Sequence, residues 1–334
     1  MSSFSTELTR RDALAVLGSA AVGLASRAIP SYPQGNDRIG KLPPSISEKS
    51  RALFRRLLED SSYSGQIPAF SVAELAKNEN TSVDQLMLAL LPFAQSYSHA
   101  PISNFYVGVV VRGASGSLYT GANIEISGQC LGFAVHAEQS ALSNAYMHGE
   151  ESVPALAVGG APCGHCRQFI EEFSPDGQIL ILTPNNPPRK LSMILPEPFS
   201  PAALGMKHGT LPIAEAKLAL TQDSSDPLTL AALDAAKKSY APYSKSPSGI
   251  ALRSSSGRIY RGSYIENVAF NPSLSPLQVA LAALIAGGES YASIQAVTLV
   301  EVQGAKISQR PVTETVLTAI APNLRLEVLR ATSA

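Results

Sequence analysis

Apolar residues recur along the chain with two different periods, and the change of period separates helices from strands. Apolar positions three and four residues apart predict short helices at 50–58 and 83–93. From Phe105 the period falls to two on both sides of the turn 113–117, which is typical of a β-hairpin. The alternation continues with strands expected at 155–158 and 179–182, and with helices expected to begin at His136 and Cys163. This order predicts an α/β fold, with helices on both faces of a mixed sheet.

The segment 100–125 is repeated at 241–266. Eleven of the 26 aligned positions are identical, whereas ordinary residue usage predicts about two by chance. The repeat occurs twice, which indicates a duplicated domain rather than a solenoid. Pro-, Gly- and Ser-rich stretches separate the parts. The expected organisation is a leader and linker at 1–46, a small N-terminal helical segment at 47–81, a first domain at 82–200, a linker at 201–221 and a second domain at 222–334.

One chemical motif occurs in the first copy alone. The first copy has His136, Ala137 and Glu138 in succession; the second, aligned with a one-residue gap, has Pro-Leu-Gln at 276–278. No cysteine follows Cys166. Residues required for folding would be kept in both copies, so this motif indicates chemistry.

The charge and the cysteine content of the chain limit the ligands and the kinds of site that this motif could serve. Lys+Arg and Asp+Glu both number 26, so the basic surplus that neutralises phosphates is missing. No stretch in the body of the chain is apolar enough to span a bilayer. We therefore expect a small neutral ligand and no nucleic-acid or membrane partner. Three cysteines do not indicate a disulfide framework. Cys130 is expected to be a buried small hydrophobe, whereas Cys163 and Cys166 form a Cys-x-x-Cys pair, either a redox dithiol or half of a metal site.

His136, Cys163 and Cys166 supply the three protein ligands of a catalytic zinc ion and leave one position for water. Both thiols lie at a predicted helix N-terminus, where unpaired amides lower a thiol pKa. Arg167 is expected to temper the thiolate charge as a neighbour of the ligands. Glu138 is placed to move protons rather than to bind the metal.

The order His-x-Glu followed by Pro-Cys-x-x-Cys is the signature of zinc-dependent nucleobase deaminases. With it, the chain resembles the cytidine deaminases, specifically the larger homodimeric kind with one working and one degenerate domain. This resemblance implies a duplicated three-layer α/β/α cytidine-deaminase-like fold and one zinc ion per chain. It implies hydrolysis of cytidine and 2′-deoxycytidine to uridine, 2′-deoxyuridine and ammonia in pyrimidine salvage. Zinc-activated water would attack C4, with Glu138 as the proton shuttle.

The resemblance also assigns substrate contacts. Asn123 and Glu125 match residues that hold the ribose hydroxyls, and Phe105 matches an aromatic residue packed on the pyrimidine. The backbone at Ala137 and Ala161 would contact the edge of the base. Core packing remains open for Phe105, because it lies in a predicted strand. A structural or interface role also remains open for Glu125, because the second copy retains a glutamate at this position.

In the family, each active site is completed by the partner's degenerate domain. The resemblance therefore implies a homodimer in which Ala269 and Phe270 reach the partner's site. Gly160 and Ala161, just before Pro162, depart from the family pattern, in which bulkier residues are expected. A deaminase of a modified cytosine nucleoside and a non-catalytic, zinc-stabilised nucleoside-binding protein remain as alternatives. A polynucleotide deaminase is disfavoured by the neutral charge and the absence of Trp.

The N-terminal region permits two interpretations of localisation. Paired arginines, Arg10 and Arg11, precede an apolar run of small residues, and 9–26 resembles a twin-arginine export signal. The family expectation is a cytoplasmic protein, for which the same residues would be an amphipathic or disordered leader.

Overall fold

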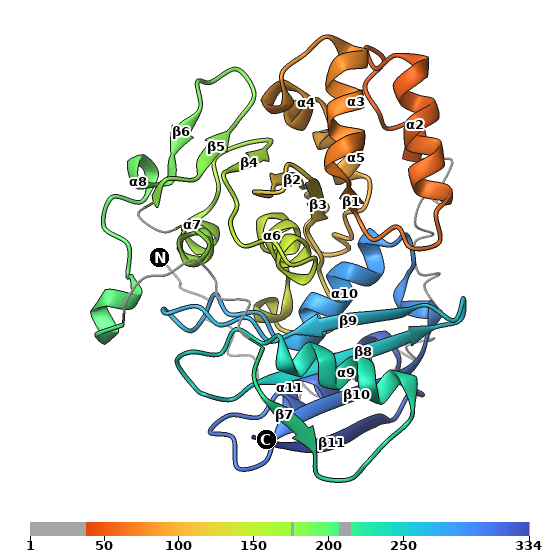
Figure 1. Ribbon diagram of the computed structural model, residues 1–334, viewed down its shortest axis with the longest axis vertical. Coiled ribbons are helices and arrows are strands. Elements are labelled where there is room, and N and C mark those ends of the chain that lie inside the picture. Colours follow the sequence, from red (N-terminus) through yellow and green to blue (C-terminus); the bar gives the residue numbers. More distant parts are fainter. Residues whose placement is uncertain (1–37, 175–176, 207–214, 334) are drawn as a thin grey trace, which may run out of the picture. The chain divides into compact units, whose positions relative to one another are not determined.

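The computed structural model describes residues 38–174, 177–206 and 215–333 (Figure 1). The export-signal prediction for 9–26 falls outside these residues. Among the described helices, none has the length and apolar character needed to cross a membrane.

The first copy is built on a six-stranded mixed sheet of order β1-β3-β2-β4-β5-β6. Strands β4 and β5 are parallel, and the other neighbours are antiparallel. The strands are β1 Gln66–Ile67, β2 Gly108–Arg112, β3 Leu118–Ala122, β4 Ala155–Val158, β5 Leu180–Leu182 and β6 Arg189–Lys190. The predicted hairpin is confirmed by β2 and β3, and the two predicted buried strands by β4 and β5.

Helices cover both faces of this sheet. A Cβ on Gly108 would meet the backbone of α5 at 2.2 Å, and a Cβ on Gly121 would meet the backbone of α6 at 2.1 Å. Glycine at both positions therefore lets the two helices approach the sheet closely. Helix α7 contacts α6 (Figure 1). The helices of this copy are α2 Glu48–Glu59, α3 Ala69–Glu79, α4 Val83–Ala89, α5 Leu91–Gln95, α6 Ala137–Met147, α7 Gly164–Glu172 and α8 Leu191–Ile194, with 3₁₀ turns η1 Leu131–Phe133 and η3 Pro201–Leu204.

Two helix predictions need correction. The helix expected at 83–93 is interrupted at Leu90 and forms α4 and α5. Pro92 explains the break, because it has no N–H for the carbonyl of Leu88 and its ring crowds the preceding turn. The segment 47–81 contains strand β1 as well as helices, and this strand pairs with β3.

The second copy repeats this plan on a five-stranded sheet of order β7-β11-β10-β8-β9. Its glycines Gly249 and Gly262 stand against the backbones of α9 and α10, as Gly108 and Gly121 stand against α5 and α6. Both copies are α/β units, as expected. Strand β7 lies inside the segment 201–221 that was expected to be a linker. The elements are β7 Leu218–Leu220, α9 Pro227–Lys237, β8 Ser248–Ser254, β9 Ile259–Ser263, α10 Pro276–Ala286, η4 Tyr291–Ser293, β10 Ile294–Val302, α11 Arg310–Ile320 and β11 Leu326–Ser333.

The structure shifts the alignment of α6 with α10 by one residue. His136 is the N-cap of α6 and Ser275 is the N-cap of α10, and each helix has a capping glutamine at its third position. Ser275 therefore stands in place of His136, and Leu277 in place of Glu138. The second copy still lacks both chemical groups.

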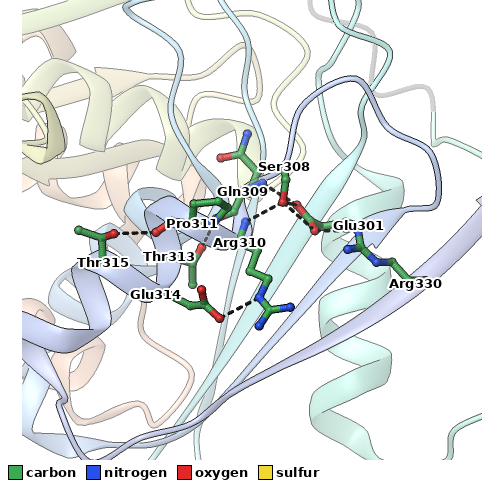
Figure 2. Close-up of polar contacts among 9 residues, drawn as sticks. All are labelled: Glu301, Ser308, Gln309, Arg310, Pro311, Thr313, Glu314, Thr315 and Arg330. Atoms are coloured by element: carbon green, nitrogen blue, oxygen red, sulfur yellow. Dashed lines mark hydrogen bonds and ion pairs between the residues drawn. The ribbon is translucent and has the colours of Figure 1, made fainter.

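In the second copy, a carboxylate lies at the start of α11, the helix that corresponds to α7. Helix α11 follows β10 as α7 follows β4. The buried carboxylate of Glu301 accepts hydrogen bonds from Ser308 Oγ at 3.0 Å and Gln309 N at 2.5 Å, and it pairs with Arg330 at 2.9 Å (Figure 2). The N-terminal end of α11 is thus neutralised from within the chain.

Candidate active site

The predicted metal ligands lie at the N-termini of two helices in contact, α6 and α7. The backbone N–H of His136 donates to Gln139 Oε1 at 3.1 Å, which fixes the start of α6. Cys163 is the N-cap of α7, and its sulfur accepts the backbone N–H of Cys166 at 3.4 Å. The N-terminal caps of α6 and α7 therefore place the imidazole of His136 close to the sulfurs of Cys163 and Cys166.

The spacing of these donors fits zinc. Nδ1 of His136 lies 3.2 Å from Sγ of Cys166 and 3.6 Å from Sγ of Cys163. All three ligand atoms lie within 4.8 Å of one another. Tetrahedral zinc with Zn–S of ~2.3 Å and Zn–N of ~2.0–2.1 Å separates nitrogen from sulfur by about 3.6 Å. The donor types and the distances both fit a three-ligand zinc site.

The position of Cys166 at a helix N-terminus does not by itself predict its pKa. Burial, followed by the charge of the Glu138 carboxylate, raises the pKa of Cys166, although the sequence predicted a lowered value. Cys166 is completely buried, and burial disfavours the charged form. This sulfur is therefore ionised when a cation lies beside it, which couples metal binding to proton release.

Arg167, which was expected beside the ligands, contacts the turn that precedes Cys163. The guanidinium of Arg167 donates to the carbonyls of Pro162 at 2.8 Å and Ile194 at 2.9 Å. It thus braces the turn before Cys163 against α8. Cys130 was expected to be buried; it is exposed and does not belong to the cluster of metal ligands.

A cavity of about 610 Å³ opens beside these donors. The side chain of Glu138 contributes to its wall and is almost buried. Gly160 also lines the cavity, and a Cβ there would meet no atom within 4 Å. The predicted site residues that line it are Phe105, Asn123, Glu125, His136, Ala137, Glu138, Ala161 and Cys163.

Asn123 and Phe105 form one wall together. Asn123 Nδ2 donates to the carbonyl of Phe105 at 2.8 Å, and Asn123 Oδ1 accepts the N–H of Val107 at 2.8 Å. The Phe105 side chain is 70 % exposed, which excludes core packing within this chain. Asn123 therefore positions the segment that presents an aromatic ring at the cavity.

Glu125 has a structural role that explains its repetition. It accepts the backbone N–H groups of Ile102 at 2.8 Å and Ser103 at 2.9 Å. In the second copy, Glu266 accepts the corresponding N–H groups of the loop that begins at 241, at 2.7 and 3.2 Å. Burial opposes ionisation of Glu125, but the hydrogen bonds from Ser103 and Ile102 outweigh it and lower the pKa of this carboxyl. The carboxylate thus supports the same loop in both copies.

Comparison with known proteins identifies the family. Two family models, both described as the cytidine and deoxycytidylate deaminase zinc-binding region, match residues 81–182 and 191–314. Cytidine deaminase of Vibrio vulnificus (strain YJ016) is 45 % identical over 256 residues, which are 77 % of this chain and 86 % of the relative. The chain belongs to the cytidine deaminase family. Cytidine deaminase of Vibrio atlanticus is 40 % identical over 294 residues, 88 % of this chain and 99 % of the relative. A crystal structure of cytidine deaminase from Mycobacterium tuberculosis is 28 % identical, with a TM-score of 0.32, covering 35 % of this chain and 96 % of that chain.

Membership of the cytidine deaminase family makes this protein an enzyme and zinc its metal cofactor. Four predicted site residues of this deaminase are not among those that line its cavity: Cys166, Arg167, Ala269 and Phe270. Ala269 and Phe270 belong to a loop of the second copy, and Phe270 is 66 % exposed with φ of +65°.

Gln139, which fixes the N-cap position of His136, was not predicted from the sequence. A signal was available, because a glutamine three residues after the N-cap occurs in both copies, as Gln139 and Gln278. Aligning these glutamines would have placed Leu277 opposite Glu138.

Proposed function

We propose that this deaminase removes the exocyclic amine of cytidine and 2′-deoxycytidine by hydrolysis, giving uridine or 2′-deoxyuridine and ammonia. One observation carries the proposal: a three-ligand metal site and a nearly buried carboxylate, Glu138, share the wall of one cavity. A purely structural zinc site is closed by four protein ligands and has no use for a carboxylate at a cavity. The non-catalytic alternative is therefore disfavoured.

His136, Cys163 and Cys166 would hold the zinc ion. Bound there, zinc would supply Lewis acidity and lower the pKa of a water molecule toward ~7. Glu138 would take the proton of that water and deliver it to N3 of the cytosine ring. Addition of that water's hydroxide to C4 would give a tetrahedral intermediate, and Glu138 would carry the proton of the new C4 hydroxyl to the amine, which would leave as ammonia.

Substrate orientation would come from the remaining cavity wall. Asn123 and Glu125 would hold the ribose hydroxyls, and Phe105 would pack on the pyrimidine. Backbone groups at Ala137 and Ala161 would contact the base edge. Asn123 and Glu125 are already held by hydrogen bonds within the chain, so their contacts to a nucleoside would use their remaining capacity.

We also propose a homodimer in which Ala269 and Phe270 of one chain reach the active site of the partner. Phe270 supports this arrangement because it is a large apolar side chain exposed on a loop. The domain limits proposed for this arrangement are 82–200 for the catalytic domain and 222–334 for the degenerate domain. Sedimentation of the purified protein tests the dimer; a monomer with full activity would contradict it.

The test of the function is turnover of cytidine and 2′-deoxycytidine, followed by ultraviolet absorbance, with zinc measured on the same sample. We expect turnover of both nucleosides with about one zinc ion per chain. Zinc without turnover would overturn the substrate assignment. That result would favour a modified cytosine nucleoside as the substrate, because the open space at Gly160 could admit it.

A further inference from the structure

The helix that carries both thiols ends in a buried carboxylate that the proposed mechanism does not use. Glu172, the last residue of α7, is 2 % exposed. It accepts hydrogen bonds from the hydroxyls of Tyr240, at 2.6 Å, and Tyr243, and from the backbone N–H of Val268 at 3.1 Å. All three donors belong to the second copy. A carboxylate is unfavourable at the negative end of a helix, so the reason for Glu172 lies in these contacts.

The phenols remain donors to this carboxylate. Burial, followed by the charge of Glu172, raises the pKa of Tyr240. A second contact reinforces the connection, because Asn267 Nδ2 donates to the carbonyl of Gln168, also in α7, at 2.9 Å. The second copy therefore contacts helix α7 both at the side chain of Glu172 and at the backbone carbonyl of Gln168.

The segment 267–278 of the second copy, which contains Asn267 and Val268, also contacts α6 near its start at His136. Gln139 Nε2 donates to the carbonyl of Pro272 at 2.9 Å. In return, Gln278 Nε2 donates to the carbonyls of Phe133 at 3.3 Å and Ala134 at 3.4 Å, just before His136. The two glutamines are equivalent in the internal repeat, so the exchange is reciprocal.

The metal ligands are divided between these two helices, and segment 267–278 contacts both. We propose that the second copy is a positioning element that, through Glu172 and Gln139, keeps α6 and α7 at the separation at which His136, Cys163 and Cys166 bind one zinc ion. Glu172 is in this view a positioning residue, since it touches neither metal nor substrate. The inference rests on the proposed zinc ligands, and it explains why a copy without catalytic groups is retained.

The variant Glu172→Gln tests the inference. Glutamine keeps the size of the side chain but presents one acceptor to three donors. The matched control is Glu150→Gln, because Glu150 is also buried and also accepts from a tyrosine, Tyr119, at 2.8 Å, while its hydrogen bonds to Tyr119 and Ser115 lie within the first copy. The readout is the rate of zinc loss to a chromogenic chelator, together with the midpoint of chemical unfolding and kcat at saturating zinc.

We expect Glu172→Gln to release zinc at least about 10-fold faster, the lower end of the ~10–100-fold loss of metal affinity that follows removal of a direct hydrogen-bond partner of a ligand, with kcat largely restored by excess zinc. Glu150→Gln should lower the unfolding midpoint and leave zinc release within about twofold of wild type. Equal rates for the two variants, or a wild-type rate for Glu172→Gln, would overturn the inference. If Glu172→Gln does not fold, Tyr243→Phe removes a single donor and is judged by the same rates. Wild-type protein without zinc would instead refute the proposed function itself.

Discussion

Replacing Glu138 with glutamine separates proton transfer from metal binding. Glu138 is the second residue of α6 and is 6 % exposed. Glutamine has nearly the same volume, so the cavity keeps its shape. The change removes the carboxylate that would carry protons and leaves His136, Cys163 and Cys166 in place.

The structure allows the two effects of this change to be ranked. A carboxylate in the first turn of a helix stabilises it by ~0.3–1 kcal/mol through the helix dipole. Loss of a positioned general acid–base lowers the rate by ~10²–10⁴, which corresponds to ~2.7–5.5 kcal/mol in the barrier. The loss of activity should therefore exceed the loss of stability several-fold.

The assay compares three quantities on the same preparation: turnover of cytidine, zinc per chain and the free energy of unfolding. We expect Glu138→Gln to hold as much zinc as wild type, to unfold within about 1 kcal/mol of it, and to turn over cytidine at least ~10²-fold more slowly. Turnover within tenfold of wild type would refute the proton-transfer role. Loss of zinc along with activity would show that Glu138 serves the metal site instead.

Three further experiments test the other parts of the site. Cys166→Ser should weaken zinc binding by more than the ~10–100-fold caused by changes beside metal ligands, as measured by chelator competition; retained affinity would remove Cys166 from the ligand set. The registers of β4 and β10 place Glu301 of the second copy at the position equivalent to Gly160. Since a Cβ at Gly160 meets open space, Gly160→Glu should fold normally but lower kcat/KM by ~10–200-fold; wild-type kinetics would show that position 160 does not face the substrate. Glu125→Gln and Glu266→Gln should both lower the free energy of unfolding by about 1 kcal/mol or more, but only Glu125→Gln should raise KM for cytidine; equal KM values would leave Glu125 a structural role alone.

The sequence predicted the sheet and the metal site well for a physical reason. Strand alternation, turns and helix caps are local signals, and the ligands His136, Cys163 and Cys166 lie on two helices that follow such signals directly. The break at Leu90 was also encoded locally, by Pro92, although the apolar period continues across it. Where apolar spacing and backbone chemistry disagreed, backbone chemistry decided the structure.

Features that depend on contacts between distant segments were not predictable in this way. The hydrogen bonds of Glu172 to donors 68–96 residues away leave no periodic trace in the sequence. The raised pKa of Cys166 likewise follows from burial and from the position of Glu138, not from the helix end that the sequence displays. Both depend on packing between elements, which residue spacing does not specify.

The two copies within one chain distinguish residues that serve folding from residues that serve chemistry. Glu150 accepts the hydroxyl of Tyr119 at 2.8 Å, and Glu289 accepts the hydroxyl of Tyr260 at the same distance. This pair recurs because both hairpins need it, and the loop-supporting carboxylate at Glu125 recurs for the same reason. The metal ligands have no counterpart, yet the second sheet and its helices form. Glu301 accepts the backbone N–H at the start of α11, the helix end that carries Cys163 in the first copy, so this end is stabilised from within the chain without metal ligands.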